Sequence, residues 1–277
     1  MATLFAPMID THCHLTFPDF EGRIPNTLEA AKAAGVLGAI TISTTPPDAE
    51  RSLAVARQFP NVWCSAGVHP LYADQGPFEW TLLRAVAFHE KCVAIGELGL
   101  DNHYSDPPRD LQRTVLEEQL QHIESWRKAG LDKPVILHCR EAFADLIPVV
   151  KQTSIPPHRF VFHCFTGDAK DMRLLLDFGA LVSFTGVVTY HNAKDVQEAA
   201  RIAPLDRIMV ETDAPFLTPH PHRGVRPNEP KFARVTAEFL ANLRQEPWDD
   251  FHRAINENTR RFFGIQWPES TGATIRS

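Results

Sequence analysis

The feature that most constrains the fold of this chain is a repeated alternation of two kinds of segment. A short β-branched or apolar run is followed by a loop and then by about ten to twenty residues with apolar side chains at helical spacing. Such alternation is typical of βα units that build a parallel sheet. The runs expected to form strands are Met8–His14, Val36–Thr44, Val62–Pro70, Cys92–Asp101, Pro134–Arg140, Phe160–Phe165, Leu181–Gly186 and Ile208–Ala214.

One helical segment follows each predicted strand. These segments are Thr27–Ala34, Asp48–Gln58, Thr81–Glu90, Leu111–Ala129, Phe143–Gln152, Ala169–Phe178, Ala193–Ile202 and Lys231–Arg244, and one additional helix is expected over Asp249–Phe263. Gly35, Gly130 and Gly179 stand where helices are expected to end. Eight βα units close naturally into a (β/α)8 TIM barrel. A doubly wound open sheet is disfavoured because the sequence lacks the glycine-rich phosphate turn of that fold.

Length and composition agree with a globular α/β protein. Of the 277 residues, 44% are hydrophobic and 22% charged, so disordered and fibrous classes are excluded. We expect one domain over residues 1–277, with its core at about 8–264 and a flexible tail at 265–277. No apolar run approaches the roughly 20 residues of a membrane helix, so a cytoplasmic location with no membrane association is expected. Five cysteines without a CxxC pair indicate reduced thiols.

The net charge of −6 argues against a protein that coats nucleic acid through a basic surface. It does not argue against a nuclease, because bound divalent cations supply their own positive charge and are held by carboxylates.

Histidines and carboxylates gather where the predicted strands end. His12 and His14 share one face of the first strand because strand side chains alternate with a period of two. Other strands end with Glu97, His138, His163 and Asp213, and the carboxyl ends of barrel strands meet at one mouth. A His-x-His pair alone is weak evidence, since a buried histidine is usually a hydrogen-bonded core residue. Burying six such groups together is costly unless divalent cations bind them.

Six ligands exceed the four of a structural zinc site, so a centre with two divalent cations is expected. A carboxylate can bridge two cations, and Glu97 is the expected bridge. The predicted ligands are His12, His14, Glu97 and Asp213 for one ion and Glu97, His138 and His163 for the other. This mixed nitrogen and oxygen set suits zinc or manganese, and magnesium less well.

Further polar residues near these ligands are candidates for substrate contact. They are His69, Asp101, Arg140, Arg223, Asn228 and Glu229. His69 and Arg140 are expected to hydrogen-bond a phosphate oxygen, or else to orient a metal ligand. The same two roles stay open for Asp101. The segment around Arg223 is either a lid that contacts DNA or a solvated loop.

Two further sets of residues stand at or near the strand ends. Phe165, Tyr190 and Phe216 are candidates for stacking on bases. The alternation that turns His138 and His163 inward predicts that Cys139 and Cys164 face the helix layer as small apolar core residues.

Eight short motifs resemble the TatD family of metal-dependent deoxyribonucleases, within the amidohydrolase-like barrels. They are IDTHCH at 9–14, GVHP at 67–70, GELGLD at 96–101, LHCRE at 137–141, FHCFTG at 162–167, SFTG at 183–186, ETDAPFLTP at 211–219 and NEP at 228–230. The resemblance runs from about Ile9 to Phe263. It implies a TIM barrel, two divalent cations and hydrolysis of DNA, commonly as a 3′→5′ exonuclease.

The sequence departs from the family pattern at two places. Asn102-His103-Tyr104 replaces an aromatic or hydrophobic pair after GLD, and Pro227 intervenes before NEP. Both positions are expected in loops at the barrel mouth, where they bear on substrate preference and leave the metal ligands intact.

The expected function is hydrolysis of phosphodiester bonds in DNA at single-stranded or frayed 3′ ends. A hydroxide bridging the two ions would attack phosphorus, and Asp213 and Glu97 are the expected catalytic residues, with Asp213 accepting the nucleophile's proton. One alternative is hydrolysis of a small ester, amide or aminoacyl-type bond by the same metals. A second is a non-catalytic interaction subunit, against which the complete ligand set argues.

Overall fold

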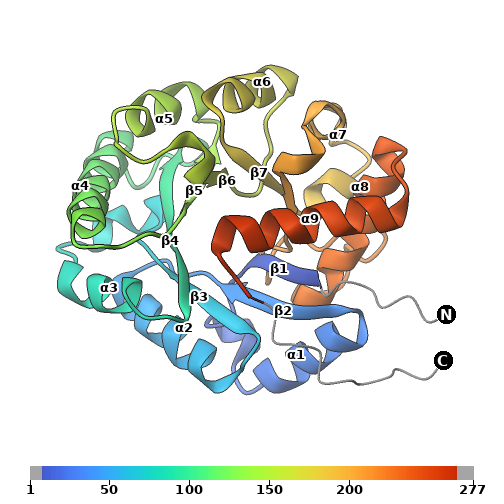
Figure 1. The fold of residues 1–277 in the computed structure, drawn as a ribbon, viewed down its shortest axis with the longest axis horizontal. Coiled ribbons are helices and arrows are strands. Elements are labelled where there is room, and N and C mark those ends of the chain that lie inside the picture. The colour runs from blue at the N-terminus through green and yellow to red at the C-terminus, as the bar shows by residue number, and fades with distance from the viewer. Residues whose placement is uncertain (1–7, 267–277) are drawn as a thin grey trace.

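The computed structural model describes residues 8–266, which form a barrel of parallel strands (Figure 1). The strands pair in chain order and are β1 (Met8–Cys13), β2 (Val36–Thr41), β3 (Val62–Ala66), β4 (Cys92–Asp101), β5 (Val135–Arg140), β6 (Phe160–Phe162), β7 (Leu181–Phe184) and β8 (Ile208–Val210). A parallel bridge between Cys13 and Ala214 joins β1 to the segment after β8. The predicted TIM barrel is confirmed.

Helices surround the barrel, as Figure 1 shows. They are α1 (Ile24–Ala33), α2 (Pro46–Gln58), α3 (Trp80–Ala87), α4 (Arg109–Lys128), α5 (Phe143–Val150), α6 (Ala169–Phe178), α7 (Lys194–Ile202), α8 (Ala233–Arg244) and α9 (Trp248–Phe263). Gly35, Gly130 and Gly179 follow helix ends with positive φ, as predicted. Within 8–266, no helix is long and apolar enough to cross a membrane.

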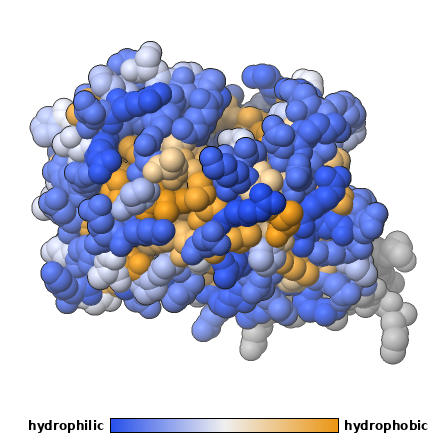
Figure 2. All heavy atoms as spheres, turned by 90° about the horizontal axis from the view of Figure 1, so that it is seen from above, coloured by the Kyte–Doolittle hydropathy of each residue, from blue (hydrophilic) through white to orange (hydrophobic). Residues whose placement is uncertain are grey.

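Two apolar layers make up the core. The larger one lies between the sheet and the helices, and a smaller one fills the barrel with side chains such as Ile9, Ile40 and Met209. Seen from the side on which α6 lies in Figure 1, the surface is mainly hydrophilic, with hydrophobic side chains visible between the polar ones (Figure 2). The helices thus turn polar faces outward, as expected for amphipathic segments.

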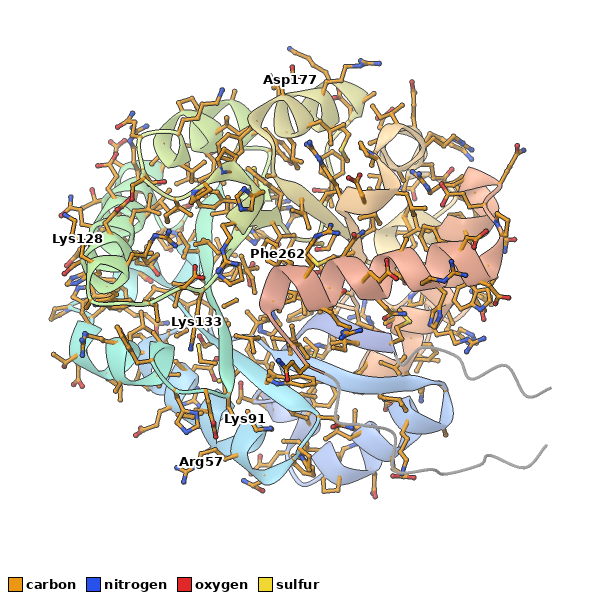
Figure 3. The ribbon with its side chains drawn as sticks, viewed as in Figure 1. Arg57, Lys91, Lys128, Lys133, Asp177 and Phe262 are labelled. Atoms are coloured by element: carbon orange, nitrogen blue, oxygen red, sulfur yellow. The ribbon has the colours of Figure 1, made fainter. Side chains whose placement is uncertain are left out.

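The additional helix α9 closes one end of the barrel. Phe262, at the end of this helix in Figure 3, packs with Phe263 and Ile265 against the interior cluster. Ile265 is 4% exposed, so the predicted tail at 265–277 begins too early. Its positions 267–277 lie outside the described residues. The mouth with the predicted ligands therefore lies at the opposite end of the barrel.

Several strands end earlier than the sequence predicts. Strand β6 stops at Phe162 and β8 stops at Val210, so His163 and Asp213 lie just beyond their strands. The reason is that the backbone leaves the extended conformation, with φ of +46° at Cys164 and +57° at Asp213. Period-two alternation therefore does not apply at these two strand ends.

Strand β4 contains an irregularity that sets the direction of the Glu97 side chain. Ile95 pairs with Val135 but Leu98 pairs with Leu137, so three steps along β4 match two along β5. Ile95 and Leu98 both belong to the layer between sheet and helices. The extra residue is a β-bulge, and it turns Glu97 toward the barrel mouth, whereas strict alternation would place it beside Ile95.

Two glycines make this bulge possible. Gly96 and Gly99 have φ of +136° and +150°, where side chains other than that of glycine are strained. An added Cβ on Gly99 would lie 1.9 Å from the carbonyl oxygen of His138, and one on Gly96 would lie 2.5 Å from that of Ile136. Close approach of β4 and β5 therefore requires glycine at both positions.

We expect Gly99→Ala to destabilise the barrel, because the new methyl group meets backbone and the residue must adopt a strained φ. The free energy of unfolding, measured by chemical denaturation, should fall by about 1–3 kcal/mol or more. Gly224→Ala is the matched control, since a Cβ there meets no atom within 4 Å. Equal unfolding free energies for the two variants would contradict the role given to Gly99.

Candidate metal centre

Glu97 lies at the centre of the site and is 1% exposed. Its Oε1 atom is 2.5 Å from Nε2 of His163 and 2.7 Å from Nδ1 of His138. Its Oε2 atom is 3.2 Å from Nε2 of His12. The two oxygens of one carboxylate thus face different histidines.

The remaining predicted ligands complete the cluster. Oδ1 of Asp213 is 3.4 Å from Nε2 of His14 and 3.7 Å from Nε2 of His12. The rings of His12 and His163 stack with centroids 3.9 Å apart. Ligand atoms of His12, His163 and Asp213 all lie within 4.8 Å of one another, as do those of His12, His14 and Glu97. The structure therefore brings all six predicted ligands together.

The state of His12 provides a test of whether these residues fit a metal. Both of its ring nitrogens are buried and neither makes a hydrogen bond within the described residues. A buried polar atom without a partner costs about 1–3 kcal/mol. Nε2 faces Oε2 of Glu97 at 3.2 Å and Oδ1 of Asp213 at 3.7 Å. A divalent cation between these atoms would remove the cost at Nε2, so the residues present fit a metal ion.

A second layer of acceptors fixes the orientation of three imidazoles. These contacts are His14 Nδ1 to the carbonyl of Ile42 at 3.1 Å, His138 Nε2 to Asp101 Oδ2 at 2.9 Å and His163 Nδ1 to Glu211 Oε1 at 3.2 Å. Each contact uses one ring nitrogen as a donor and leaves the other facing the centre. This is how metal-ligating histidines are usually held.

Charges within the cluster stabilise one another despite burial. Burial acts to raise the pKa of Glu97, but the neighbouring imidazoles, above all His163, hold it well below its usual range. Burial acts to lower the pKa of His163, yet Glu97 and Glu211 raise it well above its usual value. A divalent cation can take the place of the ring proton, because the same carboxylates attract both.

Three of the predicted substrate residues reach the mouth. His69 lies with Nε2 3.4 Å from Oε1 of Glu97, and its Nδ1 accepts the N–H of Leu71 at 3.0 Å. Its Nε2 also lies 3.2 Å from Nδ1 of His138, and ligand atoms of His69, Glu97 and His138 lie within 4.8 Å of one another. A neutral His69 carries its proton on Nε2, where it can donate to an oxygen. Arg140 places its guanidinium 5.1 Å above the ring of Tyr104.

Arg223 is the third of these residues and lies on the exposed loop after β8. Its guanidinium is 3.9 Å from the ring centroid of Tyr190. The hydroxyl of Tyr190 donates to the carbonyl of Thr218 at 3.1 Å. Arg223 is thus held over an aromatic ring that is itself anchored to the loop.

The polar atoms of the other three predicted substrate residues bond within the protein, and for Asp101 this agrees with the second role expected of it, that of orienting a ligand. Asp101 is 1% exposed and bonds His138 and the backbone N–H groups of His103 and Tyr104. Asn228 is fully buried, and its amide nitrogen donates to the carbonyls of Thr212 and Phe216. Glu229 pairs with Arg23 and Lys231 at 3.2 and 2.7 Å. Their polar atoms are already engaged within the protein.

Sequence reasoning missed Glu211, which is 1% exposed. Its Oε1 accepts the N–H of Cys164 at 2.7 Å and faces His163, and its Oε2 accepts the hydroxyl of Ser183 at 2.6 Å. The available signal was a carboxylate two residues before Asp213 at the end of an apolar strand. Asp10, two residues before His12, is similarly buried and accepts the backbone N–H of Thr212 at 2.9 Å.

Two other expectations at the strand ends are also corrected. Cys164 does not join the helix-facing layer, because its positive φ places its thiol 3.6 Å from the hydroxyl of Thr185. Phe165 is 1% exposed and packs near Phe143 and Phe184, so it offers no face to a base. Cys139 does lie in the buried layer, as predicted.

We expect Glu211→Gln to weaken metal binding, because the amide has one acceptor oxygen in place of two and loses the negative charge that faces His163. Loss of such an outer partner typically lowers metal affinity about 10- to 100-fold, measurable by competition with a chelator. The exposed Glu198 provides the control variant Glu198→Gln. Equal metal affinity of the two variants would remove Glu211 from the support of the centre.

Comparison with known proteins agrees with this geometry. A family model described as TatD related DNase matches residues 9–264. Two bacterial relatives are each named an uncharacterized metal-dependent hydrolase. YcfH of Escherichia coli is 37% identical over 261 residues, covering 93% of this chain and 96% of its own length, and YabD of Bacillus subtilis is 33% identical over 259 residues, covering 93% and 99%.

Solved structures show the same architecture. YjjV, a TatD homologue of Escherichia coli, superposes with a TM-score of 0.85 at 30% identity, covering 94% of this chain and 98% of its own. A TatD family hydrolase of Entamoeba histolytica, at 19% identity and a TM-score of 0.82, shares the fold over 93% and 98% of the two chains. The chain therefore belongs to the TatD related DNase family of metal-dependent hydrolases.

Proposed function

We propose that this hydrolase cleaves phosphodiester bonds in DNA, as a 3′→5′ exodeoxyribonuclease that acts on single-stranded or frayed 3′ ends. The observation that most supports the proposal is a buried imidazole and carboxylate cluster beneath a rim with two arginines. Arg140 and Arg223 form no ion pair with a carboxylate within the described residues, and each lies over an aromatic ring. Guanidinium groups in this state suit phosphate oxygens.

The positions of the two oxygens of Glu97 support a centre with two divalent cations. We assign His12, His14 and Asp213 to one ion, His138 and His163 to the other, and Glu97 to both. Zinc, manganese or magnesium would activate a water molecule and neutralise charge on the phosphate when bound here.

The protein's own groups divide the remaining work. The Asp213 side chain is 15% exposed, against 1% for His12 and 2% for Glu97. This greater exposure supports Asp213 as the group that accepts the proton of the attacking water. His69 donates from Nε2 to a phosphate oxygen, and Arg140 holds the same group from the β5 side of the mouth.

The depth and charge of the site favour a single strand over a duplex. His12, Glu97 and His163 are no more than 4% exposed, so a substrate has to bring its phosphate down to them. With 28 basic and 34 acidic residues in the chain, the protein does not have the positive balance typical of proteins that grip duplex DNA along its length. A thin, unpaired strand end meets both conditions.

Asp213→Asn should leave the protein folded and lower turnover by at least about 100-fold, because general-base loss typically costs 10²–10⁴ in rate. The ion assigned to Glu97, His138 and His163 should remain bound. Turnover is measured at saturating metal, with metal content and thermal unfolding measured on the same sample. Turnover close to that of the wild type would exclude Asp213 from proton transfer, and a parallel loss of stability would give it a structural role instead.

The proposal is tested with the full chain stripped of metal and reloaded with magnesium, manganese or zinc. Substrates are single- and double-stranded DNA labelled at either end, together with closed circular duplex. We expect two metal equivalents per chain and a ladder that shortens from the 3′ end of single strands. Cleavage of the closed circle as fast as the linear single strand would contradict exonuclease action. Hydrolysis of small esters or amides without any DNA cleavage would favour a small-molecule hydrolase.

A further inference from the structure

Phe216 is an apolar side chain held in solvent beside the metal centre. It is 49% exposed, the highest value among the large hydrophobic residues described as exposed. It follows Asp213 by three residues, and its backbone N–H donates to the carbonyl of Asp213 at 2.9 Å. We propose that Phe216 is a stacking platform for an unpaired nucleobase next to the scissile phosphate. This inference rests on the proposed function and names the feature of the substrate that the site recognises.

Aromatic contacts connect this ring to a metal ligand. The ring of Phe17 stacks on His14 with centroids 4.7 Å apart and planes inclined by 24°. The edge of Phe216 meets Phe17 at 6.0 Å and 79°. One ring, that of Phe17, therefore lies between Phe216 and the proposed ligand His14, so a base stacked on Phe216 belongs to a nucleotide next to the metal centre.

The loop that carries Phe216 is built to keep the ring in this position. The amide of Asn228 donates to the carbonyls of Phe216 and Thr212 and so ties the loop to the end of β8. Leu217 has a φ of +58°, which is unfavourable for leucine. A strained, hydrogen-bonded frame that exposes an apolar ring indicates a surface that a ligand completes.

Tyr190 and Tyr104 each have a guanidinium over the ring, although Tyr104 is 47% exposed, and this contact separates their role from that of Phe216. The guanidinium of Arg223 lies 3.9 Å from the centroid of Tyr190, and that of Arg140 lies 5.1 Å from Tyr104. These arginine and tyrosine pairs suit phosphates. Phe216 has no cation over it within the described residues and suits a base. Because every base has a π face, such stacking requires a base and does not select which one.

The test compares oligonucleotides in which one of the last two nucleotides is intact or abasic. For the wild type, loss of the stacked base should lower kcat/KM about 5- to 150-fold, the effect of a stack worth about 1–3 kcal/mol. Phe216→Ala should lower kcat/KM on intact DNA by a similar factor and abolish the difference between intact and abasic strands. Phe216→Trp should restore both kcat/KM on intact DNA and the difference between intact and abasic strands. Phe88→Ala, which removes another exposed phenylalanine, 39% exposed directly after α3, should behave as wild type.

A binding measurement separates this inference from the proposed function. A single strand with 2-aminopurine at the 3′ end is added to the full chain in a buffer with a metal chelator, and stacking on Phe216 should quench its fluorescence in the wild type but not in Phe216→Ala. Equal quenching by both proteins, or none by the wild type, would overturn the inference. Quenching without cleavage under any metal would refute the nuclease and leave the base site standing. Cleavage of intact and abasic strands at equal rates would refute the base site and leave the nuclease standing.

Discussion

The structure depends on keeping one carboxylate, Glu97, buried among imidazoles at the end of the barrel. An isolated ionised carboxylate is strongly destabilising in such a place. Here its oxygens lie 2.5 to 3.2 Å from ring nitrogens of His163, His138 and His12, and those rings hold its pKa well below the usual range against the effect of burial. Gly96 and Gly99 of β4 allow the bulge that turns Glu97 toward the mouth, and the second layer of acceptors holds the imidazoles in place around it.

The balance of charge in this region supports the proposal of two cations. Four carboxylates belong to the cluster or contact its histidines directly, namely Glu97, Asp213, Asp101 and Glu211. They surround four imidazoles that must be neutral to act as ligands. Two divalent cations carry the positive charge that four carboxylates balance, whereas one would leave the buried region with excess negative charge.

The sequence was sufficient to predict the barrel and the gathering of six imidazoles and carboxylates at its mouth. Alternation of strand and helix patterns survives local irregularities, and polar residues at the ends of apolar strands stand out against their surroundings. The direction of Glu97 could not be predicted from alternation, because the bulge after Ile95 shifts the pattern by one residue. Strand β1 has a similar shift, where Asp10 pairs with Ala39 but Cys13 pairs with Thr41.

The supporting residues were harder to predict because their partners are distant in the sequence. Asn228 bonds Thr212 and Phe216, and Glu211 bonds Ser183 and faces His163. Nothing in the composition of a loop shows whether an amide or carboxylate in it points into the protein or toward a substrate. That depends on whether its polar atoms find partners within the fold, which only the tertiary structure specifies.

The floor and the rim of the mouth are therefore under different constraints. The imidazoles and carboxylates at the floor lie in the barrel strands or just beyond them, and one barrel with such a floor can support many hydrolytic reactions. Substrate preference has to come from the rim. The two sequence departures from the family pattern lie there: Tyr104 lies under Arg140, and Pro227 directly precedes Asn228, which holds the Phe216 loop. Changes at these positions alter how a phosphate or base is presented and leave the cation ligands in place.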